Sequence, residues 1–189
     1  MKEFIKDIII AVIIVAAITI VIKPTIVKES SMEPTLYANN YLFVNKLAYN
    51  GKDHPEYGDI IVFKSDIERD DGKGKKMLIK RVIGVENDVM TVSDGVVYRN
   101  GTPLDEPYTL EGFTSGELYD LTVPEDQVFV MGDNRSVSLD SRDPQVGTVN
   151  EEDIVGKAFV RLFPFDEIGL LLLLGNQLYI HILKGGTPE

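Results

Sequence analysis

Residues Met77–Val85 read MLIKRVIGV, a short apolar run that contains two adjacent cations. Apolar and β-branched residues in a run of this length predict a β-strand. Side chains alternate between the two faces of a strand, so Lys80 shares a face with Leu78 and Val82, whereas Arg81 points to the other face. A lysine between apolar neighbours on its own face is expected to lose water on folding.

Comparable runs lie on both sides of this strand, and no long helical periodicity interrupts them. They are residues 41–49, 59–65, 88–93, 95–100, 127–132 and 154–163. The pair Asp94–Gly95 suits a type I′ hairpin, and Asn100–Gly101 marks the next turn. The charged stretch Asp66–Lys76 is interpreted as a solvated hairpin loop. The sequence therefore predicts a mainly β domain, either a folded sheet or barrel-like.

The N-terminus contains fifteen uncharged residues, 8–22, which is short of the ~20 residues of a comfortable membrane span. Phe4 and Ile5 extend the run, and the flanking Lys6 and Lys23 can reach the two membrane surfaces. A cleaved signal peptide is the alternative, but it needs a small-residue cleavage region that is missing before Lys23. An uncleaved transmembrane helix is therefore expected.

Three regions follow from this interpretation. Residues 1–23 form the membrane anchor, residues 24–167 the β-rich domain, and residues 168–189 an apolar tail of undefined role. Within the tail, the polar interruption and His181 argue against a second membrane span. A final strand and an interfacial helix both fit the tail.

Bulk composition excludes several classes of function. The net charge of −11 argues against nucleic acid as a partner, because phosphate binding needs clustered Lys and Arg. The chain has no cysteine, which excludes disulfides, Cys-ligated zinc and a thiolate nucleophile. Its two histidines, His54 and His181, lie in a turn cluster and in the tail, so a Ser-His-Asp triad is a poor candidate.

A serine hydrolase without histidine needs another base, and a lysine made neutral by burial can fill that role. Lys80 is the candidate, because desolvation lowers a lysine pKa and leaves an amine that can take a proton. On the residues alone a second interpretation stays open, in which Lys80 lies on an edge strand and reaches water.

Four motifs occur in a fixed order along the chain, and together they resemble a known protein family. They are SMEPTL (Ser31–Leu36), YGDIIVF (Tyr57–Phe63), KRVIGV (Lys80–Val85) and MGDNRSVSLDSR (Met131–Arg142). Together with the apolar N-terminus they resemble the bacterial type I signal peptidases, in the short single-anchor form typical of Gram-positive bacteria. The resemblance extends to about Phe165.

This resemblance implies that Ser31 is the nucleophile and Lys80 its general base. It implies no metal or organic cofactor. The expected substrates are signal peptides of exported preproteins, bound as extended strands with small side chains one and three residues before the cut. The expected location is the outer face of the bacterial cytoplasmic membrane, with the lipid bilayer as a second partner.

The resemblance also implies supporting roles. Gly132 would leave room near the lysine, and Ser138 would hydrogen-bond the Lys80 amine and orient it. Asp140 and Arg142 resemble a structural ion pair.

Asp133 and Arg81 are a second expected pair. The alternative for the whole block of residues 131–142 is a charged turn with capping hydroxyls.

Glu29 departs from the family pattern. Some relatives have a serine two residues before the nucleophile, and short-form relatives commonly have glycine there. A carboxylate cannot donate a hydrogen bond to an oxyanion, so the Ser31 N–H is expected to be the main donor. Glu29 also supports an alternative function, a membrane-anchored β domain that binds exported peptides with weak or no cleavage. Substitution of Ser31 by alanine distinguishes the two.

Overall fold

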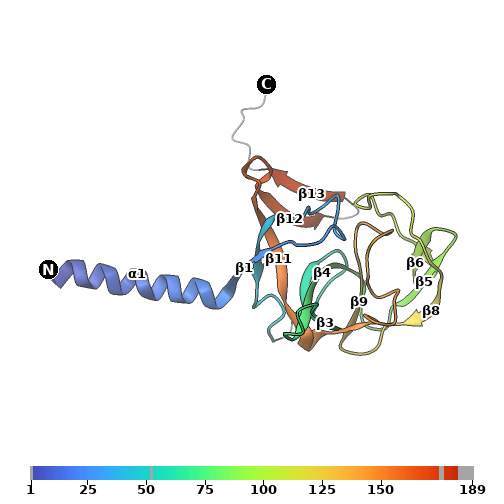
Figure 1. Cartoon of the computed structure of the whole chain (residues 1–189), viewed down its shortest axis with the longest axis horizontal. Coiled ribbons are helices and arrows are strands. Elements are labelled where there is room, and N and C mark those ends of the chain that lie inside the picture. Colours follow the sequence, from blue (N-terminus) through green and yellow to red (C-terminus); the bar gives the residue numbers. More distant parts are fainter. Residues whose placement is uncertain (1, 52, 175–176, 183–189) are drawn as a thin grey trace, which may run out of the picture.

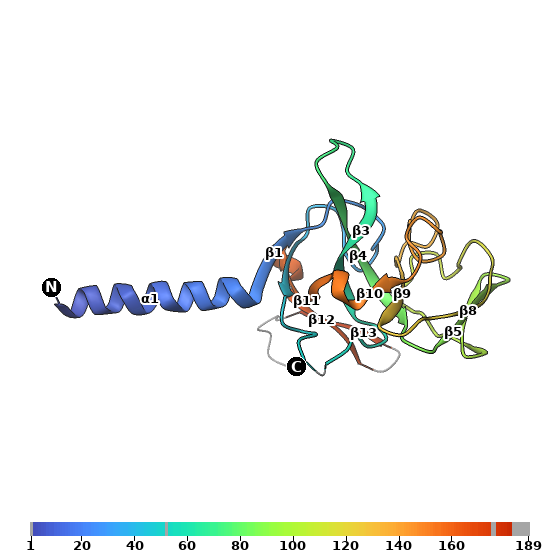
Figure 2. The same cartoon turned by 90° about the horizontal axis from the view of Figure 1, so that it is seen from below.

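The computed structural model describes residues 2–51, 53–174 and 177–182. A long helix, α1 (Lys2–Val21), extends from one side of a β body (Figures 1 and 2). It is long and apolar enough to cross a membrane, and none of its apolar window is buried against the body. At 1.5 Å per residue, its 20 residues span about 30 Å, the thickness of a bilayer's hydrocarbon core.

The body contains two sheets and two short 3₁₀ helices. The nine-stranded sheet follows the path β1-β2-β11-β3-β4-β9-β10, with β12 paired to β11 and β13 to β12, and the second sheet has the order β7-β6-β5-β8. The strands of the nine-stranded sheet are β1 (Ile22–Ile26), β2 (Tyr41–Asn45), β3 (Ile60–Glu68), β4 (Lys75–Gly84), β9 (Gln127–Met131), β10 (Val149–Asn150), β11 (Ile154–Phe163), β12 (Gly169–Leu174) and β13 (Gln177–Ile182). The remaining elements are β5 (Val89–Ser93), β6 (Val96–Arg99), β7 (Thr102–Pro103), β8 (Leu118–Thr122), η1 (Glu151–Asp153) and η2 (Phe165–Glu167).

The prediction of a mainly β domain is confirmed, and the described strands form open paths rather than a closed barrel. All seven predicted runs contain a strand. The turn Asp94–Gly95 joins β5 to β6, and both of its residues have positive φ, as a type I′ turn requires. Asn100 and Gly101 also have positive φ and join β6 to β7.

β4 is the interior strand that organises the body. It pairs with β3 along one edge and, from Arg81 onward, with β9 along the other. The β3–β4 hairpin, whose tip is the charged loop predicted from sequence, projects from the body in Figure 2. Before Arg81, β4 has no pairing on its β9 side within the described strands, which leaves part of one edge open.

Within the predicted tail, residues 169–174 and 177–182 form two strands rather than an interfacial helix, and residues 175–176 and 183–189 lie outside the described residues. β12 pairs with β11 through Leu170 and Gly169, and β13 pairs with β12. Leu171 is buried in the same core cluster as Val44 and Ala158. A continuous apolar run has no period that separates strand from helix, which is why the sequence left both open.

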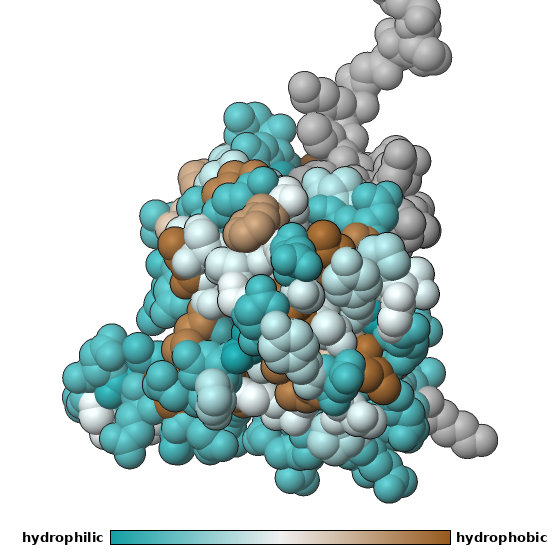
Figure 3. Space-filling view, turned by 90° about the vertical axis from the view of Figure 1, so that its right-hand side faces the viewer, coloured by the Kyte–Doolittle hydropathy of each residue, from teal (hydrophilic) through white to brown (hydrophobic). Residues whose placement is uncertain are grey.

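Three hydrophobic clusters form the core. One packs the turn after β1 against β2 and β11, a second joins β4 and β9 to the second sheet, and a third lies around β3, β4 and β10. The second sheet lies at the end of the body away from α1 (Figures 1 and 2). On the face shown in Figure 3, hydrophobic residues lie in separate small patches among hydrophilic ones.

Candidate active site

Ser31 lies in the turn that follows β1. Hydrogen bonds from Glu33 N–H to Ser30 O (3.1 Å) and from Leu36 N–H to Met32 O (2.8 Å) fold this turn. The Met32 and Leu36 side chains are buried in the core and fasten the turn to the body. Ser31 itself keeps 8% of its surface exposed, at the rim of a groove.

Lys80 lies opposite Ile61 in the middle of the nine-stranded sheet. Its side chain is 1% exposed, and its Nζ lies 2.6 Å from Ser31 Oγ. The interpretation in which Lys80 reaches water is therefore wrong, because its side chain is buried although β4 is unpaired on its β9 side at this position. The structure thus brings the two predicted catalytic residues, 49 positions apart in the chain, within hydrogen-bond distance.

Burial lowers the pKa of the Lys80 amine below that of an ordinary lysine, because the ammonium loses its hydration. The carboxylates of Asp140, Glu29 and Asp133 act in the opposite direction, but the net shift is downward. A larger fraction of the amine is therefore neutral near neutral pH, and a neutral amine can accept a proton from Ser31.

Gly132 lies against the Ser31 backbone and the Ser138 side chain. A Cβ added there would overlap the Ser31 carbonyl oxygen and the Ser138 side chain. The structure therefore has no space for a side chain at position 132, and the nearest atoms belong to Ser31 and Ser138.

Ser138 differs from its expected role. Its Oγ accepts a hydrogen bond from Gly132 N–H (3.1 Å), whereas within the described residues the Lys80 amine bonds to Ser31. The cause is local: Ser138 N–H bonds to Asn134 O, which folds the turn so that the hydroxyl faces the Gly132 amide. The structure therefore shows Ser138 acting on Gly132, and no bond from it to Lys80.

Both expected ion pairs form. Arg81 donates to Asp133 through Nε (2.9 Å) and Nη2 (2.6 Å), and Arg142 donates to Asp140 through Nε (2.9 Å) and Nη2 (2.9 Å). Asp140 also accepts from Gly132 N–H (3.0 Å), so the second pair holds the glycine. Among the described residues, neither pair makes a hydrogen bond to Ser31 Oγ.

Several residues of the site were not predicted as such from the sequence. Thr35 donates to Asp133, and Asn134 N–H donates to Ser31 O (3.1 Å). Arg135 is buried with Glu106 as its partner, 29 residues earlier. Thr35, Asn134 and Arg135 lie inside the recognised motifs, which was a usable signal, whereas nothing local marks Glu106.

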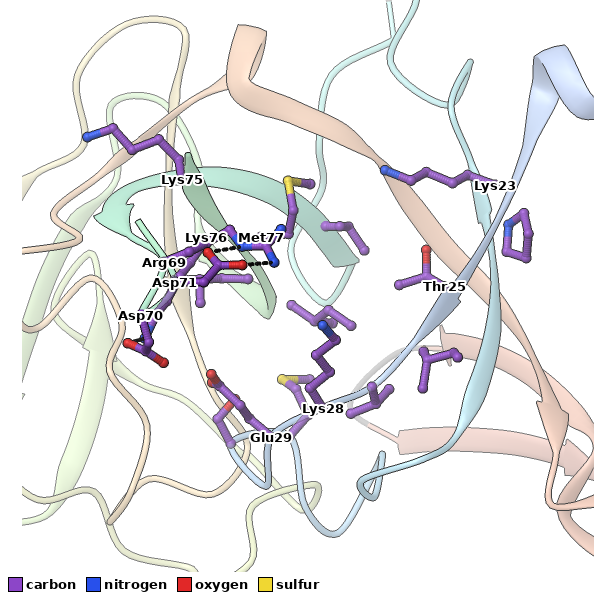
Figure 4. Close-up of a pocket in the computed structure, with 18 residues that line it drawn as sticks. Lys23, Thr25, Lys28, Glu29, Arg69, Asp70, Asp71, Lys75, Lys76 and Met77 are labelled. Atoms are coloured by element: carbon purple, nitrogen blue, oxygen red, sulfur yellow. Dashed lines mark hydrogen bonds and ion pairs between the residues drawn. The ribbon is translucent and has the colours of Figure 1, made fainter. Parts of the chain in front are cut away.

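A groove of about 680 Å³ runs past Ser31. Its walls are β1 with the following residues on one side and the first half of β4 with the β3–β4 hairpin tip on the other. In Figure 4, Lys28 and Glu29 lie on the first wall and Arg69, Asp70 and Asp71 on the second. Arg69 and Asp71 pair with each other there.

The Ser31 N–H makes no hydrogen bond among the described residues. It is therefore free to donate to an oxyanion, as the sequence suggested. Glu29 is exposed, lines the groove, and belongs to no ion pair within the described part of the chain. Its carboxylate lies on the side of the groove that carries the nucleophile.

A comparison of this chain with known protein families gives a match over most of its length. The family "Signal peptidase, peptidase S26" matches residues 1–163. The chain belongs to this family. The matched range includes α1, the turn that contains Ser31, β4 and residues 131–142.

Similar members of the signal peptidase family come from several bacteria. A probable signal peptidase I-2 of Synechocystis is 40% identical over 167 residues, covering 88% of this chain and 75% of that protein. Signal peptidase I P of Bacillus subtilis subsp. natto is 35% identical over 176 residues, covering 88% and 91%. A crystal structure of a signal peptidase I from Enterococcus faecalis aligns with 57% of this chain and 98% of its own, at 28% identity and a TM-score of 0.46.

Proposed function

We propose that this chain is a membrane-anchored serine endopeptidase that removes signal peptides from exported preproteins. Ser31 is the nucleophile and Lys80 its general base. The observation that carries the proposal is the 2.6 Å separation of Lys80 Nζ and Ser31 Oγ, with the amine 1% exposed. Membership of the signal peptidase family supports the substrate class.

In the first step the neutral Lys80 amine takes the Ser31 proton while Oγ attacks the scissile carbonyl. The carbonyl oxygen becomes an oxyanion, which the Ser31 N–H stabilises. The C–N bond then breaks, and the Lys80 ammonium gives its proton to the departing amine. The signal peptide is left as an ester on Ser31, and Lys80 is neutral again.

In the second step Lys80 takes a proton from water, and the resulting hydroxide equivalent attacks the ester. The C–Oγ bond breaks, and the proton returns from Lys80 to Ser31.

Two unpaired strand edges could bind an extended substrate. Among the described strands, β1 is paired only with β2, and β4 is unpaired on its β9 side before Arg81. An extended substrate can add to these edges as a strand, above Ser31.

The membrane part of the proposal rests on α1 and on one sheet face. Ile26, Tyr41 and Phe163 lie directly opposite one another on β1, β2 and β11, so they share a face, and all three are exposed. Phe165, 77% exposed, stacks edge-on against Phe163 with ring centroids 5.4 Å apart. Exposed aromatic residues beside a membrane helix suit the lipid interface. We place the body on the outer side of the cytoplasmic membrane.

The test is cleavage of a preprotein in lipid by the wild type, Ser31→Ala and Lys80→Met, from about pH 6 to about pH 10. A general base acts when neutral, so the wild-type rate should rise with pH through a midpoint below that of an ordinary lysine. Both variants should lose nearly all activity. Cleavage by either variant at the wild-type rate contradicts the dyad, and binding without cleavage by the wild type favours a receptor.

A further inference from the structure

Two arginines, Arg81 and Arg135, are the largest fully buried side chains among the described residues. A buried guanidinium needs a nearby acid and full hydrogen bonding. Asp133 serves Arg81 from within residues 131–142. Arg135 instead pairs with Glu106 from the loop between β7 and β8, through Nη1–Oε2 (2.8 Å) and Nη2–Oε1 (2.6 Å).

Tyr108, from the same loop, contacts Arg81 and also Glu106, the counter-ion of Arg135. Its ring lies under Arg81, with Cζ 4.1 Å from the ring centroid. Its hydroxyl donates to Glu106 Oε1 (2.9 Å) and lies 3.2 Å from the Tyr57 hydroxyl. The loop thus contacts the residue that follows Lys80 in β4 and supplies the counter-ion of Arg135.

Two consecutive carbonyl groups beside Ser31 are held, one by Arg135, the partner of Glu106, and one by Leu110 of the same loop. Arg135 Nε donates to Gly132 O (3.0 Å), and Leu110 N–H donates to Asp133 O (3.1 Å). These contacts set the path of the backbone at Gly132, the residue with no space for a side chain against Ser31. The next amide, Asn134 N–H, holds the Ser31 carbonyl (3.1 Å).

We propose that residues Glu106–Leu110, here called the clamp loop, position Ser31 relative to Lys80 from the second sheet, with Glu106 as the principal positioning residue. The proposal rests on the Ser31–Lys80 mechanism proposed above. The clamp loop does not line the groove, so it acts through Arg135 and Gly132 and does not touch substrate. In the competing explanation, the clamp loop only links the two sheets and has no effect on the position of Ser31.

The main test is Glu106→Gln in the full-length protein in lipid. Glutamine has nearly the same shape as glutamate but lacks the negative charge that holds the Arg135 guanidinium in place. Small misplacements of catalytic groups are costly, so kcat should fall about tenfold or more. KM should stay unchanged, because Glu106 lies outside the groove. The pH of half-maximal rate should also stay, because Asp140, Glu29 and Asp133 are the main carboxylates that raise the Lys80 pKa.

Asp88→Asn is the matched control. Asp88 is buried at the edge of the second sheet and accepts from Arg99 Nε (2.7 Å) and Val85 N–H (2.8 Å), without contact to residues 131–142. This variant should lower the melting temperature while kcat per folded molecule stays within about twofold, as expected for a site distant from the chemistry.

Tyr108→Phe supplies a milder second variant, should Glu106→Gln fail to fold. It keeps the ring under Arg81 and removes the hydroxyl that fixes Glu106, so kcat should fall severalfold at constant KM. An unchanged kcat in the folded variants, or a fall no larger than in Asp88→Asn, overturns the clamp loop. Activity in Ser31→Ala would instead overturn the dyad, so the two failures are distinguishable.

Discussion

At the residue scale, the carboxylates around Lys80 are not equivalent. Asp133 is paired with the buried Arg81 and Asp140 with the partly buried Arg142, whereas Glu29 is exposed and belongs to no ion pair among the described residues. All three raise the pKa of Lys80 against the larger effect of burial. Glu29 is therefore the carboxylate that can be removed without leaving an arginine unpaired.

Substitution Glu29→Gln should shift the pH profile. Removing this negative charge lowers the Lys80 pKa further, so the rise of kcat/KM with pH should begin at lower pH than in the wild type. The measurement is the pH dependence of preprotein cleavage. Glu125→Gln, the same change at an exposed glutamate that is not one of the main charges acting on Lys80, should leave the profile in place. A shift to higher pH contradicts the assignment.

Substitution Ser138→Ala tests which partner this hydroxyl serves. The Gly132 N–H would keep its bond to Asp140 (3.0 Å), so activity should fall less than in Lys80→Met. The pH of half-maximal rate should not move, because the observed hydrogen bond of Ser138 is to Gly132 and not to Lys80. A clear move of that pH in titration of the cleavage rate would instead support a direct bond to the amine.

At the element scale, the nucleophile turn is held by two core side chains. Leu36 is fully buried, so Leu36→Ala should lower the free energy of unfolding by about 2–5 kcal/mol. Reversible chemical denaturation of the full-length chain in detergent measures this. Leu47→Ala, at an exposed leucine after β2, is the control and should have little effect. Equal effects of the two variants would contradict the anchoring of the turn.

The strands that the sequence predicted are those with dense apolar and β-branched residues, such as β3 and β4. β1 (IKPTI) contains a proline and a lysine, and β8 (LYDLT) has mixed polarity, so neither has a clear period. Both lie at the end of a sheet path, where tertiary pairing overrides local preference.

The sequence predicted those residues of the site whose chemical type and place in a motif identify them. Ser31, Lys80 and the pairs of Arg81 and Arg142 belong to this group. The hydrogen bond of Ser138 depends on the exact fold of one turn, and Glu106 meets Arg135 only through the docking of two sheets. Contacts of this kind have no local pattern in the sequence.

At the scale of the whole molecule, the apolar row of Ile26, Tyr41, Phe163 and Phe165 should contact lipid. The chain contains no tryptophan, so Phe165→Trp introduces a single tryptophan whose fluorescence can be excited apart from that of the tyrosines. Brominated acyl chains in vesicles should quench it. Phe113→Trp, at an exposed site beside the second sheet, should stay unquenched. Equal quenching at both positions, or none at Phe165→Trp, contradicts the proposed orientation.

The passage from α1 to β1 has a mechanical consequence. The helix ends at Val21 and the strand begins at Ile22, so no flexible linker separates the anchor from the sheet that carries the groove. Ser31 follows Val21 by ten residues, at most about 35 Å of chain. With α1 in the bilayer, as proposed above, this short connection would keep Ser31 at a nearly constant height above the membrane surface. We therefore expect cleavage at a preferred distance from the membrane, and a flexible insertion after Val21 should broaden the choice of cleavage position.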